Sequence, residues 1–299
     1  YMKAVNNQDP LKRIVHSQIG TDSQSSIKGR ISSTSNALYV PWKNGSLYEN
    51  GYISKLSHSG ELQWRKQIAD VNQITTATDK DEKIYAAWSR NSDFTKETRG
   101  SFIAQLNPDN GEIVWKTELE SHNYIINDLH AVGNTLYAVG QYKGTKRPLF
   151  IAVNRNDGTL LWQKEVAASD STAFTEIDSD GSNLYVSSKS ALGISGTVHQ
   201  FNLDGSVVEA WNGSDRQKLS RTNTQDQTSV IVGNQIISAG KTSLDEFYDG
   251  SSWRIVSRNL QTGSINWRQQ WGSSGDKSIS SITEFNGKIY AVAIERKGK

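Results

Sequence analysis

The chain has 299 residues, a formal net charge of +2 and no cysteine. The absence of cysteine excludes disulfides, thiolate metal sites and thiol nucleophiles, and the near-neutral charge shows no basic stripe for nucleic acid. No stretch approaches the roughly 18 consecutive apolar residues of a membrane helix. Tyr1 is not an initiator, so we expect that an upstream segment has been removed. Frequent Ser, Thr, Asn and Gln favour a secreted, periplasmic or cell-surface protein.

Two short patterns recur from the beginning of the chain to its end. In the first, a turn glycine is followed four residues later by tryptophan. Its copies are Gly60–Trp64, Gly111–Trp115, Gly158–Trp162 and Gly263–Trp267, with a variant copy at Gly205 and Trp211. In the second, tyrosine follows Leu or Ile within a short apolar run. Its copies are Tyr39, Tyr85, Tyr137, Tyr185 and Tyr290, with Ile237 in the variant copy. Both patterns repeat about every fifty residues, which is the signature of a repeat architecture.

Each repeat contains four short runs that alternate apolar and polar residues between Gly, Asn, Asp or Ser turns. Such runs predict four antiparallel strands, and four-stranded units at this period are typical of propeller blades. In the third copy we expect strands over 125–132, 135–142, 148–153 and 159–166. The blades are expected at about 27–68, 72–118, 125–166, 173–211, 226–271, and 279–299 together with 1–19. No window shows a sustained helical period.

The last repeat is completed by the start of the chain. Residues 2–20 (MKAVNNQDPLKRIVHSQIG) match residues 150–167 (FIAVNRNDGTLLWQKEVA), with Val15 in the tryptophan position. We therefore expect the C-terminal segment to supply two inner strands and the N-terminal segment two outer strands, which leaves no half-built blade with open edges. The sequence predicts an all-β fold, a single six-bladed β-propeller with four-stranded blades over residues 1–299.

The repeated aromatic residues are expected to be structural. At a fixed position in every repeat they would pack between neighbouring blades, each contributing about 1.5–3 kcal/mol by burial. The combination of an apolar strand, the glycine-to-tryptophan turn and the Leu/Ile-Tyr strand resembles the quinoprotein-like (PQQ-type) propeller repeat. The segment WGSSGDKSISSITEFNGKIYAVA also resembles the bacterial SBBP propeller repeat.

These resemblances imply a propeller more specifically than they imply an activity. Quinoprotein dehydrogenases of the PQQ type have eight blades, and some carry an adjacent cysteine pair at the cofactor. This chain has six repeats and no cysteine, so we expect no quinone cofactor. Relatives of the repeat in outer-membrane protein assembly bind other proteins without catalysis.

In propellers of this type one face bears the loops between the second and third strands together with the starts of the inner strands. In this sequence those loops are more basic than the chain as a whole, and aromatic residues lie among the charges. Aromatic and cationic side chains together can stack on sugars or hold a partner surface. The candidate ligand-binding residues are Phe94, Lys96, Arg99, Tyr142, Lys143, Lys146, Arg147 and Tyr248 in the loops, and His122, Tyr124, Asp276 and Lys277 at inner-strand starts. A solvated, idle surface is the alternative interpretation.

Residues 178–183 (DSDGSN) resemble the start of a calcium loop, with Asp178 and Asp180 as possible ligands. The distal bidentate glutamate of an EF-hand is missing, and an Asp-Gly hairpin turn accounts for the segment more simply. We therefore expect no cofactor, with calcium as the alternative. Asn44 and Asn212 match glycosylation acceptors but are equally explained as turns.

The leading hypothesis is a non-catalytic binding or scaffold propeller that engages a protein or an acidic glycan through its loop-rich basic face. No residue is assigned a catalytic role. The rival hypothesis is a carbohydrate-active enzyme, a polysaccharide hydrolase or lyase with carboxylates at the central opening, and a redox quinoprotein comes third. Neither nucleic-acid binding nor a membrane span is expected. Oligomeric state and ligand identity stay open.

Overall fold

The described residues of the computed structural model form β-strands and the turns between them. They are residues 2–6, 9–15, 26–27, 29–44, 50–68, 71–90, 100–119, 124–142, 147–166, 171–190, 196–208, 228–243, 251–260, 264–271, 276–285 and 288–296. Within these ranges no helix is long and apolar enough to cross a membrane. The chain divides into two compact units, Val15–Ala167 (the first unit) and Tyr1–Ile14 with Ala168–Lys299 (the second unit).

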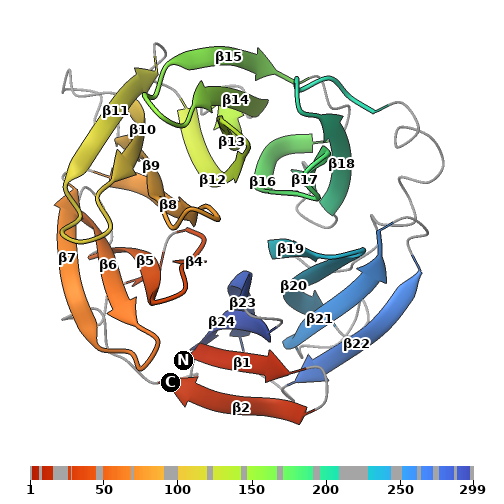
Figure 1. The fold of residues 1–299 in the computed structure, drawn as a ribbon. Helices are drawn as coiled ribbons and strands as arrows, with labels where there is room; N and C mark the ends of the chain where they lie inside the picture. The colour runs from red at the N-terminus through yellow and green to blue at the C-terminus, as the bar shows by residue number, and fades with distance from the viewer. Residues whose placement is uncertain are drawn as a thin grey trace. The chain divides into compact units, whose positions relative to one another are not determined.

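The first unit contains three antiparallel sheets, each built from consecutive strands (Figure 1). One sheet consists of β3 (Ser26–Ile27), β4 (Ser32–Ser33), β5 (Ala37–Lys43), β6 (Gly51–Ser57) and β7 (Leu62–Ile68). The next consists of β8 (Val71–Thr78), β9 (Ile84–Arg90), β10 (Ser101–Leu106) and β11 (Ile113–Leu119). The third consists of β12 (Tyr124–Val132), β13 (Thr135–Tyr142), β14 (Pro148–Asn154) and β15 (Leu160–Glu165). The third sheet matches the four strands predicted from the sequence to within one residue at each end.

Neighbouring sheets of the first unit pack face to face through buried apolar side chains. Tyr85, Leu119, Ile126 and Leu149 belong to one core cluster, which joins the sheet β8–β11 to the sheet β12–β15. A second cluster joins the sheet β3–β7 to the sheet β8–β11. Because the sheet β8–β11 is covered on both faces by these clusters, its middle strands read as nearly continuous apolar runs.

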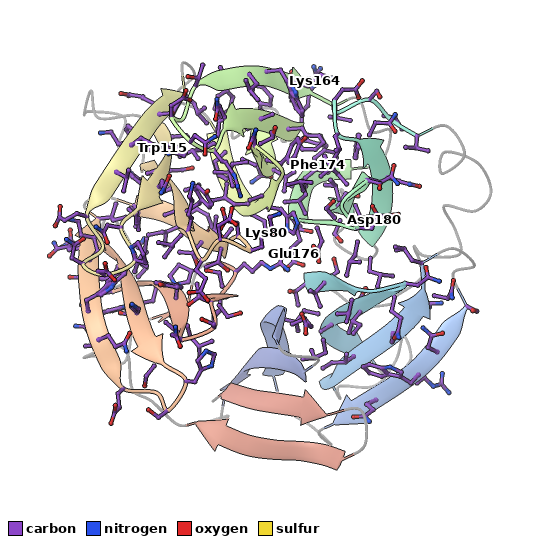
Figure 2. All side chains as sticks on the ribbon, viewed as in Figure 1. Lys80, Trp115, Lys164, Phe174, Glu176 and Asp180 are labelled. Atoms are coloured by element: carbon purple, nitrogen blue, oxygen red, sulfur yellow. The ribbon has the colours of Figure 1, made fainter. Side chains whose placement is uncertain are left out.

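The repeated glycine and tryptophan meet between adjacent sheets. Gly111 lies in the turn before β11 with φ +73°, and a Cβ on it would stand 2.9 Å from the ring of Trp64. Trp64 donates its indole N–H to the Pro108 carbonyl in the same turn at 2.9 Å. Gly158 repeats the arrangement on Trp115 (Figure 2), with φ +79°, and a Cβ there would stand 2.5 Å from the ring. The prediction that the repeated tryptophans pack between blades is therefore confirmed for Trp64 and Trp115.

The second unit contains three further sheets. Their strands are β16 (Ser171–Ser179), β17 (Asn183–Ser190) and β18 (Gly196–Asn202); β19 (Thr228–Val232), β20 (Gln235–Ser243), β21 (Ser251–Asn259) and β22 (Ile265–Trp271); and β23 (Asp276–Phe285), β24 (Lys288–Arg296), β1 (Met2–Asn6) and β2 (Asp9–Val15). The predicted fourth strand around Trp211 lies outside the described residues.

The N-terminal strands complete the C-terminal sheet, as the sequence predicts. The strand order is β2-β1-β24-β23, and β1 pairs antiparallel with β24 through Met2↔Val292 and Val5↔Ile289 (Figure 1). The two ends of the chain thus share one sheet, and β24 keeps a hydrogen-bonded partner on both sides. Pairing of this kind protects a strand that would otherwise end the sheet.

Four-stranded antiparallel sheets built from consecutive strands and packed face on face are the blades of an all-β propeller. This fold class agrees with the sequence analysis. The count of six blades and the boundaries assigned to each blade stay predictions.

Candidate binding site

The site begins at one end of the sheet β12–β15, where two tyrosines face each other across neighbouring strands. Tyr124 starts β12 and Tyr142 ends β13, and the register pairs them directly. Their ring centroids lie 4.9 Å apart at an interplanar angle of 86°, an edge-to-face contact. Such contacts stabilise the pair by about 0.5–1.5 kcal/mol beyond burial, so the two rings fix each other's orientation.

Arg147 and two polar residues of β15 complete this end of the sheet. The backbone N–H of Tyr142 donates to the Arg147 carbonyl at 2.9 Å, which closes the connection from β13 to β14. Gln163 donates its amide N–H to the Tyr124 hydroxyl at 2.5 Å, and Arg147 Nη1 lies 2.5 Å from Glu165 Oε1. We call Tyr124, Tyr142, Arg147, Gln163 and Glu165 the tyrosine–arginine cluster.

Electrostatics within the cluster follow from its packing. Burial and hydrogen bonding to Tyr124 raise the pKa of Tyr142 above its ordinary value, so the phenol stays neutral and can donate or accept a hydrogen bond. The hydrogen bond to Glu165 and the negative charge of that carboxylate raise the pKa of Arg147, which therefore stays a cation. Tyr124 is buried in the core, so the groups that a ligand can reach are the half-buried phenol of Tyr142 and the largely exposed guanidinium of Arg147.

Three of the predicted binding residues meet here, because the start of an inner strand and the second-to-third loop share one end of the sheet. They are Tyr124, Tyr142 and Arg147. Asp276 and Lys277 begin β23 in the second unit, where the register pairs them with Arg296 and Glu295. The other predicted residues, Phe94, Lys96, Arg99, His122, Lys143, Lys146 and Tyr248, lie outside the described residues.

Asp178 and Asp180, the candidate calcium ligands, bind groups of the protein itself. Asp178 accepts hydrogen bonds from the backbone N–H of Ser179, at 2.8 Å, and of Ile231 in the neighbouring sheet. Asp180 (Figure 2) lies in the turn between β16 and β17 and accepts from the N–H of Asn183 at 2.7 Å and from the Tyr185 hydroxyl at 2.8 Å. The predicted hairpin turn is confirmed, with Gly181 at φ +91°.

Hydrogen bonds decide the ionisation of Asp180. Burial raises the pKa of its carboxyl, but hydrogen bonds from Asn183, Ser182 and Tyr185 outweigh burial, and the net pKa lies below its usual value. No group of three or more His, Asp or Glu side chains suited to a metal ion occurs among the residues that the structure describes.

Two carboxylates on the described inner strands, Asp128 and Glu176, make structural contacts. Asp128 on β12 is fully buried and pairs with Arg30 Nη1 at 3.0 Å. In the second unit Glu176 on β16 accepts a hydrogen bond from the backbone N–H of Ser229 on β19.

One protein family accounts for most of the chain. A family model described as "Outer membrane protein assembly factor BamB", of the PQQ-repeat type, matches residues 49–286. The chain belongs to this family. The resemblance to the PQQ-type repeat is thereby confirmed. No curated protein matches the chain.

Solved structures similar to this family member have names that point to varied functions. The chain is 11% identical to the Hadza microbial sialidase Hz136, with a TM-score of 0.60 over 91% of this chain and 66% of the sialidase chain. It is 12% identical to the WD40 propeller domain of Doa1, with a TM-score of 0.56 over 99% and 86% of the two chains. It is 12% identical to hydrazine synthase of Kuenenia stuttgartiensis, with a TM-score of 0.54 over 82% of this chain and 67% of the hydrazine synthase chain. At these identities the similarity shows the fold alone.

Sequence reasoning on this BamB-family chain missed Gln163 and Glu165 of the cluster. Both lie on the outermost strand of the sheet, which the repeat pattern identified only through Trp162. The observed register pairs Leu149 with Glu165, which brings the residue before Pro148 close to the end of β15. Side chains diagonal to each other across an antiparallel pair are within reach when they are long, as in Arg147 and Glu165.

A second polar network was also missed, at the opposite end of the same sheet. Arg155, in the β14–β15 turn, reaches Asp79 at 2.7 Å and Asp81 at 2.6 Å, both in the β8–β9 turn. The Tyr85 hydroxyl donates to Asp79 at 2.9 Å, which helps to raise the pKa of Tyr85 beyond the effect of burial. In this family member the network joins two blades and is largely buried, so its role is structural.

Proposed function

We propose that this BamB-family chain is a non-catalytic scaffold that binds an acidic protein surface through its basic loop face, with the tyrosine–arginine cluster at the centre of that surface. The observation that carries the proposal is the gathering of Tyr124, Tyr142 and Arg147 at one end of the sheet β12–β15. The connection that follows Tyr142 also carries Lys143 and Lys146 in the sequence.

Physical chemistry favours an anionic partner for this surface. The side chain of Arg147 is 65% exposed, so a partner can reach its guanidinium. Arginine and tyrosine are among the residues that most often dominate protein interfaces. A cationic surface also attracts an acidic partner before contact and speeds association.

A binding role is supported over catalysis by the state of the carboxylates. A hydrolase or lyase needs an acid–base pair within hydrogen-bond reach of its substrate. In the described parts of the chain, Asp128 and Glu176 on inner strands are engaged with protein groups. The family description, an assembly factor, agrees with a protein partner and with a periplasmic location at the outer membrane. We extend both to this chain as part of the proposal, together with six-bladed closure.

Charge reversal at the site tests the proposal directly. Lys143, Lys146 and Arg147 are changed together to Glu, and binding of fluorescent poly-L-glutamate is measured as a stand-in for an acidic protein surface. The reversal should abolish binding while the melting temperature stays within a few degrees. The matched control reverses Lys80, Lys83 and Lys116, which lie elsewhere in the first unit, and should keep at least half of the affinity.

Two results would count against a protein-binding scaffold. Unchanged binding after the site reversal would show that the partner uses another surface. Selective binding on a glycan array, with turnover of the bound glycan, would instead support the carbohydrate-active enzyme that the sequence analysis kept as its rival.

A further inference from the structure

The guanidinium of Arg147, which an acidic partner would contact, is already paired with the carboxylate of Glu165. Arg147 Nη1 and Glu165 Oε1 lie 2.5 Å apart, and the side chains are 65% and 35% exposed. Glu165 ends β15 and Arg147 immediately precedes β14, so the pair bridges two strands of one sheet at the rim of the cluster. The same surface therefore presents a cation together with its own internal carboxylate.

An exposed pair of this kind is weakly bound and readily exchanged. Solvent screens the attraction, and holding two long side chains in one geometry costs entropy, so such pairs add little to stability. A carboxylate supplied from outside forms the same charge-assisted hydrogen bond to the guanidinium. Exchange of one carboxylate for another at Arg147 thus costs the protein little beyond the loss of the internal contact.

The surroundings of the pair restrict what can replace Glu165. The backbone of Tyr142 is hydrogen-bonded to the Arg147 carbonyl, so the phenol ring and the guanidinium are held on one short connection. Gln163, two residues before Glu165 on β15, holds the Tyr124 hydroxyl. A group that displaces Glu165 must therefore be an anion that reaches Arg147 where the start of β14 lies beside the end of β15.

We propose that Glu165 is an internal competitor that occupies Arg147 until a carboxylate of the bound protein displaces it, and that it thereby sets the affinity of the site. This inference rests on the proposed function and deepens it, because it assigns Arg147 a carboxylate-bearing partner and Glu165 a role in specificity. The charge of Glu165 lowers the affinity for every acidic partner, and partners with a well-placed Asp or Glu overcome this most readily.

The test is a double-mutant cycle on the full chain with poly-L-glutamate as the probe. Glu165→Gln removes the competing charge and should tighten binding about twofold to fivefold, the range expected for an exposed ion pair. Arg147→Gln should weaken binding. In the double variant the gain from Glu165→Gln should disappear, because the competitor acts only through Arg147. Melting temperatures of all variants should match the parent chain.

Glu112→Gln is the matched control. Glu112 forms a similar exposed pair with Lys66 at 2.9 Å, away from the cluster, and its replacement makes the same change in net charge. It should leave binding unchanged. If Glu112→Gln tightens binding as much as Glu165→Gln, or if the gain persists without Arg147, the affinity follows the net charge of the chain. The inference is then wrong.

The outcome also separates this inference from the proposed function. Suppose that binding depends on salt and is lost on reversing Lys143, Lys146 and Arg147, but that Glu165→Gln has no effect. This result would overturn the role of Glu165 as an internal competitor and leave the proposed function standing. No binding of poly-L-glutamate by the parent chain or by Glu165→Gln would overturn both.

Discussion

At the scale of single residues, the repeat is explained by the contact between a turn glycine and the tryptophan of the preceding blade. Gly111 and Gly158 adopt positive φ and stand against Trp64 and Trp115, where a Cβ would lie closer than side chains normally approach. A turn that needs both left-handed backbone and a bare Cα selects glycine. The glycine and tryptophan positions of the repeat therefore mark a contact between neighbouring blades rather than a ligand site.

Replacing Gly158 by alanine should destabilise the fold more than the same change at Gly133. Both glycines have positive φ, but a Cβ at Gly133 meets nothing within 4 Å, whereas at Gly158 it meets the Trp115 ring at 2.5 Å. Backbone strain alone costs about 1–2 kcal/mol, and the clash should add about 1–3 kcal/mol. Denaturant unfolding measures the free energy of unfolding of both variants. Equal decreases would show that the contact with the Trp115 ring is unimportant.

Arg155 should be more important for stability than its partner Asp81. Removing the guanidinium leaves Asp79, whose side chain is 2% exposed, without its ion-pair partner, so Arg155→Gln should cost about 3 kcal/mol. Asp81 is 46% exposed, and Asp81→Asn should cost well under about 1 kcal/mol. Chemical denaturation of the two variants tests the difference. Comparable losses in the free energy of unfolding would contradict the view that the buried Arg155–Asp79 ion pair joins the two blades.

Asp180 should contribute stability that depends on pH. Its pKa is lowered in the folded chain, so its contribution is present above the unfolded pKa of about 3.9 and is lost as the pH falls through the folded value. Asp180→Asn should therefore lower the free energy of unfolding near pH 7 and have little effect on it in acid. EDTA should leave the melting temperature of the parent chain unchanged. A rise of several degrees with calcium that Asp180→Asn abolishes would instead establish a metal site.

At the scale of strands, the sequence predicted the elements well because each repeat alternates apolar and polar residues between clear turns. The strands of the sheet β12–β15 and the order β2-β1-β24-β23 agree with expectation. The first strand of the first sheet did not form a single element. It is divided into β3 and β4, both paired with β5, around Gly29, whose bare Cα lies against the backbone of Ile74.

Contacts between distant residues were harder to predict than strands. Tyr124, Tyr142 and Arg147 could be placed together because strand direction alone brings them to one end of a sheet. Glu165 and the Arg155–Asp79 pair were missed because their side chains meet across strands or blades 18 and 76 residues apart. Local patterns do not encode which of several exposed charges come within hydrogen-bonding distance of each other.

The outer strands show a further regularity that protects their edges. In β7, β11, β15 and β22 the register shifts at the residue just before the tryptophan, which forms a β-bulge. Bulges twist an edge strand and interrupt its hydrogen-bonding ladder, which discourages pairing with another chain. Val114 and Leu161 occupy two of these bulges and are exposed, so the chain tolerates apolar residues where strand pairing is already blocked.

Removing residues 1–19 should leave one edge of β24 without a partner. The truncation deletes β1 and β2, and with them the backbone pairing from Met2 to Val292. We expect aggregation or a large fall in melting temperature, since an unpaired strand invites association. Size-exclusion chromatography and thermal unfolding measure the result. A monomeric truncated chain with an unchanged melting temperature would contradict the shared sheet.

At the scale of the whole molecule, the chain belongs to a family described by an assembly factor for outer membrane proteins, and its fold is similar to that of solved structures with unrelated names, a sialidase and a WD40 propeller domain. Function must therefore be argued from surfaces and not from the fold. Three predicted binding residues lie together in the tyrosine–arginine cluster, beside a connection that carries two more cations in the sequence. The central claim is that this basic surface binds an acidic protein.

The most direct measurement is the affinity of the unmodified chain for poly-L-glutamate as ionic strength is raised from about 50 mM to about 500 mM. Exposed charges are screened over roughly 4–14 Å in that range, so a partner held by Arg147 and the neighbouring lysines should bind progressively more weakly. We predict at least a tenfold loss of affinity, with the loss much reduced after reversal of Lys143, Lys146 and Arg147. Affinity that is independent of salt, or equally sensitive after the reversal, would contradict the account.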